Sequence, residues 1–266
     1  MTELIRIRAS SLPELFDCPA RWEAKNIKGM RLPSSGAAQL GRAVHAGTAL
    51  FDLGRIRGAG LSAEDCAAEV VKTIREPREE VDWGDSSPAA MEGIALALHR
   101  KYCAEIAPGF DFVDVEAECR GLEITGLSIV LTGTTDRVYR DERGRFGIAD
   151  IKTGKSAVGT DGTVRTAGHA AQVAVYELLA EEATGRQMDA PAVIIGLQTA
   201  KTDAGRRAGT GSVTGARELL AGREGAPGLL EAAAAMLRSG IFFGNPRSTL
   251  CHQKYCPAYE SCRFRR

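Results

Sequence analysis

The chain has 266 residues, with 34 basic and 34 acidic side chains, and 44% of it is hydrophobic. This is the composition of an ordinary globular protein, and it excludes a disordered chain, a collagen-like chain and a small disulfide scaffold. Glu3, Arg6 and Arg8 interrupt the N-terminal stretch that a signal peptide would need to be apolar, and no later run approaches the ~20 apolar residues of a membrane span. A cytoplasmic protein with no membrane contact is therefore expected.

Helical patterns dominate the first hundred residues. A short helix is expected over 12–18, after two serines that can cap it and before a proline. A second helix over 37–54 carries its apolar residues on one face, and the Ala-rich stretches 62–76 and 86–107 have the same helical spacing. We expect the part from about 46 to 107 to be a helical insertion.

The pattern changes to period two after residue 110. Apolar residues alternate with acids over 110–119, and two further strand-like segments follow at 129–140 and 145–152. The turn-like sequence DERGR joins the last two segments. Antiparallel strands are therefore expected here.

The second half of the chain returns to mixed patterns. Residues 167–183 predict an amphipathic helix, and 191–200 predict a short apolar strand. Residues 201–225 are rich in Gly, Thr, Arg and Ala without clear periodicity, which predicts a loop. Residues 226–240 predict a helix that leads into the cysteine-containing end of the chain.

Two acids and a lysine are placed to meet on the predicted hairpin. Arg143, at the centre of the turn, is equally distant in sequence from Asp136 and Asp150, so a symmetric hairpin places these carboxylates opposite each other. Lys152, two residues after Asp150, shares its face. Because opposed acids repel each other, this register needs a cation to compensate their charge. A divalent metal with a lysine beside it would provide that cation, and the combination suits phosphodiester hydrolysis. The alternative is a solvated hairpin on which the acids and the lysine pair with one another.

Three residues on predicted helices are further candidates. His45, four positions after Gly41, lies among small and apolar residues, where a histidine is either packed in the core or a ligand. Gln172 and Tyr176 are spaced i, i+4 and share one helix face, which either lines a site or packs in the core. None of these residues is decisive alone.

Four segments in order, GRAVH, GTTDRV, IADIKTG and QVAVY, resemble the PD-(D/E)XK nucleases and in particular their RecB-type exonuclease branch. That family has Gly-x-x-x-His on a helix, an Asp after a Gly on a strand, Asp/Glu-x-Lys on the next strand and Gln-x-x-x-Tyr on the following helix. The matching positions here are Gly41 and His45, Gly133 and Asp136, Asp150 and Lys152, and Gln172 and Tyr176.

The resemblance implies an α/β fold with a restriction-endonuclease-like mixed sheet flanked by helices, and a deoxyribonuclease that depends on Mg2+ or Mn2+. It implies a main-chain carbonyl near Ile151 as a further metal ligand, and a place for Gln172 and Tyr176 near the DNA backbone. The site residues that it implies are His45, Asp136 and Asp150 for the metal, and Asp136, Asp150, Lys152, Gln172 and Tyr176 for catalysis.

Seven cysteines in a chain without an export signal favour metal binding or free thiols over disulfides. Cys18 stands just before a proline near the start, while Cys251, Cys256 and Cys262 form C-x4-C-x5-C at the other end. The remaining cysteines, which lie beside apolar residues and are expected in the core, are Cys66, Cys103 and Cys119.

RecB-type nucleases with an iron-sulfur cluster, among them the AddB subunit and CRISPR-adaptation and phage exonucleases, use one cysteine before the nuclease core and three after it. The resemblance implies that Cys18, Cys251, Cys256 and Cys262 hold a 4Fe-4S cluster. The first C-terminal gap, four residues here and usually two in AddB-like members, is more similar to the phage relatives. A structural Zn2+ site, in which His252 replaces one thiolate, is the main alternative, and unliganded thiols are another.

The expected organisation follows from joining the two ends. Residues 1–35 and 241–266 would form a cluster-binding subdomain, and 36–240 the nuclease core. Basic residues outnumber acidic ones 9 to 5 over 1–58 and 11 to 5 over 201–266, while the acidic centre has 14 against 24. Such charge blocks are either solvated faces or a binding surface for a polyanion.

We therefore expect a metal-dependent exonuclease that acts on single-stranded DNA ends in recombination, repair or phage DNA processing. The chain has no P-loop sequence, so it would act alone or beside a helicase, a recombinase or an annealing protein. The alternative is a non-hydrolytic nucleic-acid-binding or assembly module that has kept the nuclease fold.

Overall fold

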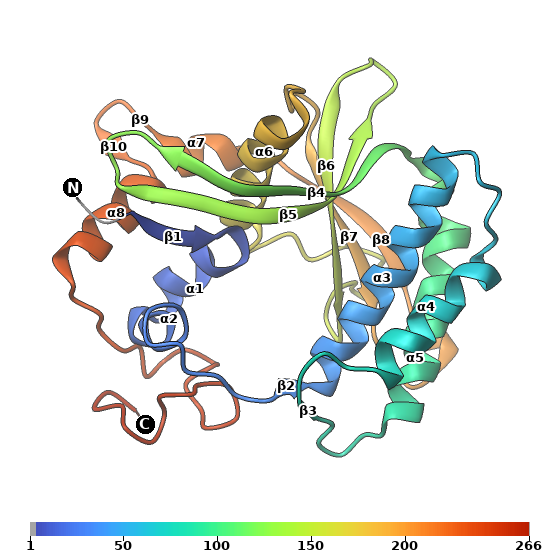
Figure 1. Ribbon diagram of the computed structural model, residues 1–266, viewed down its shortest axis with the longest axis horizontal. Coiled ribbons are helices and arrows are strands. Elements are labelled where there is room, and N and C mark those ends of the chain that lie inside the picture. The colour runs from blue at the N-terminus through green and yellow to red at the C-terminus, as the bar shows by residue number, and fades with distance from the viewer. Residues whose placement is uncertain (1–3, 266) are drawn as a thin grey trace.

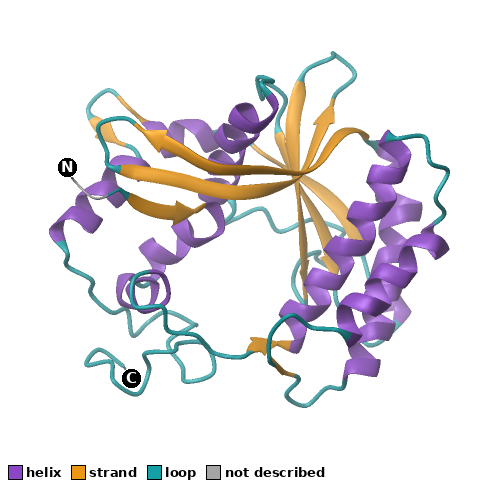
Figure 2. Ribbon diagram, in the orientation of Figure 1, coloured by secondary structure: helices purple, strands orange, loops and turns teal. Residues whose placement is uncertain are grey.

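The computed structural model describes residues 4–265, and its centre is a mixed six-stranded sheet with helices on both faces (Figures 1 and 2). The strands are β1 (Ile5–Arg8), β4 (Asp111–Ile124), β5 (Ile129–Arg140), β6 (Phe146–Gly154), β7 (Ala192–Gln198) and β8 (Ala208–Val213). One edge of β5 pairs with β4, and its other edge pairs first with β1 and then with β6. The β1–β5 and β6–β7 pairs are parallel, and the other pairs are antiparallel. The predicted mixed α/β fold is thus confirmed.

The helices form two groups, one on each side of the sheet (Figure 1). The first group is α3 (Gly36–Ile56), α4 (Ala63–Arg75) and α5 (Pro88–Lys101); the second is α1 (Leu12–Asp17), α2 (Pro19–Asn26), α6 (Ala170–Thr184), α7 (Ala216–Ala221) and α8 (Leu229–Ser239). Successive side chains of a strand point to opposite faces. Hence Ile148 and Ile194 enter the core with α6, whereas Ala149 and Ile195 enter the core with α3.

The hairpin of β5 and β6 has the register predicted from the sequence. Arg137 pairs with Ala149, so Asp136 and Asp150 are the next opposed positions. The carboxylate of Asp141 accepts hydrogen bonds from the main-chain N–H groups two and four residues further on, which closes the turn between the strands. The two acids are therefore fixed opposite each other by a local turn.

The helices expected over 62–76 and 86–107 are present. Ser62 caps α4, because its hydroxyl accepts a hydrogen bond from the main chain three residues later. Helix α5 continues into a π-helix over Tyr102–Ile106. Helix α3 is continuous through residue 46, so no break in secondary structure marks the expected start of the insertion. The short strands are β2 (Ser34–Ser35), parallel to β3 (Val81–Asp82), and β9 (Gly222–Arg223), antiparallel to β10 (Ala226–Pro227).

Residues 201–225 are not the loop that the sequence predicted, because they contain β8 and α7. The strand lacks apolar alternation because two of its glycines lie under the segment that precedes α6. A Cβ atom on Gly211 would lie 2.8 Å from Cγ2 of Thr166, and one on Gly209 would lie 3.1 Å from Cγ2 of Val164. The glycines thus reflect close packing on this strand.

Two elements near the start were not predicted. Strand β1 alternates as IRIR, but its four residues are too short a run to identify a strand alone. Helix α2 begins directly at Pro19, a position in the first turn where the missing N–H of proline costs no hydrogen bond. The proline that was expected only to end one helix therefore also begins the next.

The segment after α8 has no helix or strand up to residue 265, and it packs against α1 and α2. The side chain of Asn245 donates to the carbonyl of Asp17 at 2.9 Å, and Ser248 Oγ donates to the Asp17 carboxylate at 2.6 Å. The ring of Phe242 stacks on Trp22. These contacts join the two ends of the described chain.

The division into a terminal subdomain, 1–35 with 241–266, and a core, 36–240, stays a prediction; residues 1–3 and 266 lie outside the described residues. No helix within residues 4–265 is long and apolar enough to cross a membrane.

Candidate functional site

A cleft of about 1120 Å³ opens between α3 and α4 on one side and the β5–β6 hairpin on the other. Five of the predicted site residues line it: His45, Asp136, Asp150, Lys152 and Tyr176. They come from α3, β5, β6 and α6. The fold therefore brings together residues from four elements that are well separated in the sequence.

His45 and Asp136 contact each other where α3 crosses the sheet. Nδ1 of His45 lies 3.2 Å from Oδ1 of Asp136, and Nε2 lies 3.0 Å from the main-chain oxygen of Ile151. Oδ2 of Asp136 accepts a hydrogen bond from the N–H of Ile151 at 2.8 Å. Gly41, one turn before His45, allows this close approach, since a Cβ atom there would lie 3.0 Å from Oγ1 of Thr153. His45 thus faces the cleft with its side chain partly exposed.

The two opposed carboxylates have pKa shifts in opposite directions. Burial raises the pKa of Asp136, but the charge and hydrogen bond of His45 outweigh it and lower the pKa to about 2. Burial raises the pKa of Asp150 to about 6, with Lys152 opposing and Asp136 reinforcing the shift. Neighbouring buried carboxylates with divergent pKa values are typical of functional sites.

Lys152 is paired with the more buried of the two acids. Its Nζ lies 2.7 Å from Oδ2 of Asp150, and Asp150 is only 2% exposed. Apart from this ion pair, Oδ2 has no hydrogen-bond partner in the described part of the chain. The alternative for these residues was a hairpin whose acids and lysine pair on a solvated face. The burial of Asp150 in the wall of a cleft is not consistent with that alternative.

Gln172 and Tyr176 lie side by side on α6. Nε2 of Gln172 donates to the hydroxyl of Tyr176 at 3.1 Å, and both residues are buried. Burial raises the pKa of Tyr176 well above its ordinary value, so its hydroxyl remains neutral. Gly133 leaves room for the ring, because a Cβ atom there would lie 3.1 Å from Cε1 of Tyr176.

The side chains in the cleft are engaged with one another rather than gathered around one point. Across residues 4–265, no group of three or more His, Cys, Asp and Glu side chains is arranged to hold one metal ion. The donor set nevertheless fits a hard divalent cation, because it offers the carboxylates of Asp136 and Asp150, the Ile151 carbonyl and the His45 imidazole.

The cleft has further wall residues, of which only Glu116 was considered from the sequence, as an acid on a strand that could add a carboxylate or be solvated. Arg42, Lys72 and Arg78 line it from α3, α4 and the segment after α4. Glu116 lines it from β4 with a left-handed φ of +53°, which is rare outside glycine. Helical spacing identifies the core face of a helix, but it does not tell which exposed residue faces a cleft.

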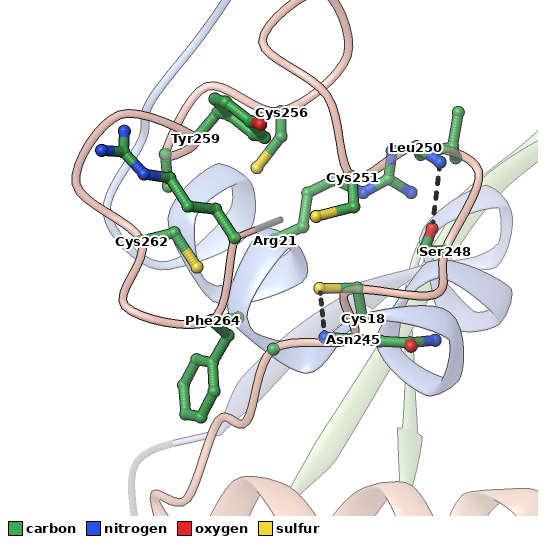
Figure 3. Close-up of a pocket in the computed structure, with 14 residues that line it drawn as sticks. Cys18, Arg21, Asn245, Ser248, Leu250, Cys251, Cys256, Tyr259, Cys262 and Phe264 are labelled. Carbon is green, nitrogen blue, oxygen red and sulfur yellow. Dashed lines mark hydrogen bonds between the residues drawn. The ribbon is translucent and has the colours of Figure 1, made fainter.

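The four cysteines near the two ends line a second, much smaller cavity of about 20 Å³ (Figure 3). The sulfur atoms of Cys18, Cys251, Cys256 and Cys262 point toward the space between them. The sulfur of Cys18 accepts a hydrogen bond from the N–H of Asn245 at 3.4 Å. This donor set fits a group held by several thiolates, although the thiols do not converge on a single ion.

None of the seven cysteines, all of which lie within the described residues, forms a disulfide bond. The three that were expected in the core are indeed buried: Cys66, Cys103 and Cys119. Burial raises the pKa of Cys103 to about 12 and also raises that of Cys66, so these two thiols remain protonated at neutral pH. They belong to the packing of the helices.

A comparison with protein families agrees with the motif pattern. The family model described as the PD-(D/E)XK nuclease superfamily matches residues 6–263. A solved structure titled "Crystal structure of SSO0001" aligns over 99% of this chain and 88% of that chain, with 13% sequence identity and a TM-score of 0.43. A search of curated proteins gave no match.

Proposed function

The chain belongs to the PD-(D/E)XK nuclease superfamily, and on this premise we propose that it is a Mg2+- or Mn2+-dependent RecB-type deoxyribonuclease that degrades DNA from single-stranded ends. The superfamily consists of metal-dependent phosphodiesterases. The observation that carries the proposal is the meeting of His45, Asp136, Asp150 and Lys152 in one cleft.

A metal ion would be held by His45, Asp136, Asp150 and the carbonyl of Ile151. Once bound, it would neutralise charge on the phosphodiester and promote the ionisation of water. The carboxylates provide the oxygen ligands that Mg2+ and Mn2+ prefer. His45 would have to exchange its contact with Asp136 or with the Ile151 carbonyl for the ion.

Lys152, Gln172 and Tyr176 would act on the substrate. Asp150 holds the Lys152 ammonium at the cleft, where it can orient the attacking water and stabilise negative charge on the phosphoryl oxygens. The neutral hydroxyl of Tyr176, placed by Gln172, can donate a hydrogen bond to a backbone phosphate. Lys152 and Tyr176 line the cleft, whereas Gln172 does not line it and would act by placing the hydroxyl of Tyr176.

The catalytic assignment is tested by Asp136→Ala, Asp150→Ala and Lys152→Ala, with Lys155→Ala as the control because Lys155 is exposed outside the cleft. We expect each of the first three to lower cleavage in Mg2+ or Mn2+ by about 100-fold or more, and the control to cleave like the parent. Lys152→Ala should still bind Mn2+ and DNA. Cleavage by all three variants would place the active site elsewhere.

The same assay separates the nuclease from the alternative, a non-hydrolytic binding or assembly module with the same fold. A parent protein that binds DNA but does not cleave it in either metal would favour that module. The chemistry of the cleft favours the nuclease, because a binding module has no use for a buried Asp150 beside Lys152.

The substrate is tested with linear single strands, circular single strands and linear duplexes of equal length. Degradation of linear single strands should be fastest, circles should largely resist, and binding should weaken steeply with salt. Rapid nicking of circles would indicate an endonuclease.

Because the chain has no P-loop sequence, we propose that a helicase, recombinase or annealing protein supplies single strands in recombination, repair or phage DNA processing.

We further propose that the terminal cysteines hold a 4Fe-4S cluster. Each thiolate of such a cluster binds a different iron, so the thiols must surround a cavity and need not meet at one ion. The positions of Cys18, Cys251, Cys256 and Cys262 around their shared cavity support this proposal, and a structural Zn2+ site is the alternative. The cluster would fasten together the two ends that hydrogen bonds already join.

Anaerobic purification with iron and zinc quantitation tests the cluster. The parent should be brown, with a broad visible absorption that bleaches on reduction. Cys256→Ser should lose the colour, and Cys119→Ser, which alters a buried cysteine outside the cavity, should keep it. If the purified protein contained stoichiometric zinc and no iron, the cysteines would form a zinc site and the cluster proposal would be wrong. The nuclease proposal would be unaffected.

A further inference from the structure

Arg137 directly follows Asp136 on β5, and its side chain points to the other face of the sheet, into the core formed with α3 and the π-helix. It is 1% exposed. A guanidinium stays charged in proteins, so burying one is costly unless its N–H groups find partners. The partners of Arg137 therefore show what this charge does in the fold.

Each of the three nitrogens of the guanidinium donates to a different residue, two of them on α3 and one on β5 itself. Nε donates to Oδ2 of Asp52 on α3 at 2.7 Å, and Nη2 donates to Oγ1 of Thr48, one turn earlier, at 3.1 Å. Nη1 donates to the main-chain oxygen of Asp136 at 2.7 Å. Tyr102, in the π-helix, donates its hydroxyl to the same oxygen of Asp52 at 2.5 Å. Asp52, Thr48 and Tyr102 are all completely buried.

The network continues from Thr48 to the candidate site. The hydroxyl of Thr48 donates to the main-chain oxygen of His45 at 3.0 Å. Arg137 is thus bonded directly to the backbone of Asp136 and, through Thr48, to the backbone of His45. On the opposite side of that backbone, the side chains of His45 and Asp136 lie 3.2 Å apart in the cleft.

From this geometry we propose that Arg137, with Thr48 and Asp52, is a positioning group that fixes the backbone at His45 and Asp136, so that both metal ligands are held in place before the ion binds. The inference rests on the proposed metal site. Groups that orient ligands from behind typically change metal affinity by about 10- to 100-fold when they are lost. If these residues served packing alone, their loss would change the stability of the fold without changing its affinity for metal.

The test uses Thr48, because truncating Arg137 or Asp52 leaves a buried charge unpaired and destabilises the whole fold. Thr48→Val keeps the shape of the side chain and removes its hydroxyl, whereas Thr48→Ser keeps the hydroxyl. The control is Tyr139→Phe, which deletes a buried hydroxyl on the same face of β5, where Tyr139 donates to the carbonyl of Pro191 outside the network.

The readout is Mn2+ binding to the full-length protein, measured by titration calorimetry without DNA, beside thermal unfolding. Thr48→Val should weaken Mn2+ binding by about tenfold or more, and Thr48→Ser should bind within about twofold of the parent. Tyr139→Phe should unfold at a lower temperature and bind Mn2+ like the parent. Equal Mn2+ affinity in the parent and in Thr48→Val would overturn the positioning role alone. A parent that binds no Mn2+ would overturn the metal site and this inference together.

Discussion

Gly41 lies where α3 comes nearest to β6, one turn before His45. The Gly41→Ala variant would place a Cβ atom 3.0 Å from Oγ1 of Thr153, so the helix or the threonine must shift by a few tenths of an ångström. Because His45 is on the same helix, we expect Gly41→Ala to reduce cleavage more strongly than it reduces stability. Cleavage rates and thermal unfolding of the same preparation measure the two effects.

Gly93 provides the matched control for that substitution. It lies inside α5, exposed, and a Cβ atom there would meet nothing within 4 Å. Gly93→Ala should raise the free energy of unfolding by about 1 kcal/mol, because alanine restricts the unfolded chain and favours the helix. Its cleavage rate should equal that of the parent; a loss of activity there would mean that any alanine in these helices disturbs the site.

His99 is a buried histidine whose charge state links stability to pH. Burial lowers its pKa below the usual 6.5, although its hydrogen bond to the Ala63 carbonyl and the nearby Asp52 and Glu64 oppose the shift. Between the lowered pKa and 6.5 the unfolded chain binds more protons than the folded one. The contribution of His99 to stability is therefore present above pH 6.5 and is lost as the pH falls through this range.

His99→Gln keeps an N–H donor for the Ala63 carbonyl and removes the titration. Denaturant unfolding at about pH 7.5 and about pH 5.5 should show a smaller loss of stability for this variant than for the parent. Other groups, such as Asp150 and His45, titrate in the same way in the parent and in the variant. The difference between the two proteins in their loss of stability therefore isolates the contribution of His99. An equal loss in the two proteins would show that His99 is not kept neutral by burial.

The opposed acids of the candidate site could be predicted from their spacing on a hairpin, whereas its helix residues were assigned only through the ordered motifs of the resemblance. Symmetry about Arg143 was enough to oppose Asp136 and Asp150, since the turn held by Asp141 sets the register. The Arg137 network was not predicted, because its members come from three elements and no local pattern shows that they meet.

At the scale of elements, β8 depends on its glycines. Gly211→Val would force a branched side chain against Thr166 and Val164, both within 3.2 Å of an ideal Cβ atom. Overpacking of this kind costs about 1–3 kcal/mol, so the melting temperature should fall clearly. Ser212→Val, one residue later on the exposed face, should change stability by no more than about 0.5 kcal/mol. Similar melting temperatures for both variants would show that the covering segment moves away readily.

Long elements with a clear period were predictable and short or glycine-rich ones were not. Helices α3 and α4 and the strands of the β5–β6 hairpin carry enough apolar repeats to reveal their type. Strand β1 is too short, and β8 has its periodicity replaced by glycines that pack against a neighbouring segment. Such packing is a tertiary property, so a local window of sequence does not contain it.

At the scale of the whole molecule, Ser248 and Asp17 hold the two ends of the chain together. Ser248→Ala removes a buried hydroxyl that donates to the Asp17 carboxylate at 2.6 Å, which should lower the free energy of unfolding by about 1–2 kcal/mol. The segment after α8 should then be cut faster in limited proteolysis. Ser239→Ala removes two local bonds, one to the carbonyl of Met236 and one from the N–H of Ile241, but none to α1 or α2, and should leave the rate of cutting unchanged. Equal rates in the parent and in Ser248→Ala would mean that other contacts alone hold this segment.

The stacking of Phe242 on Trp22 also has a consequence for synthesis on the ribosome. The indole leaves the exit tunnel early, but the residues that cover it are made some 220 positions later. At about 5–20 residues per second, this delay amounts to roughly 10–45 seconds. During that time the strands can fold as they emerge while the face of Trp22 that Phe242 covers stays exposed, and a nascent chain in this state is a natural client for chaperones. Packing around Trp22 is therefore completed only after Phe242 has been translated.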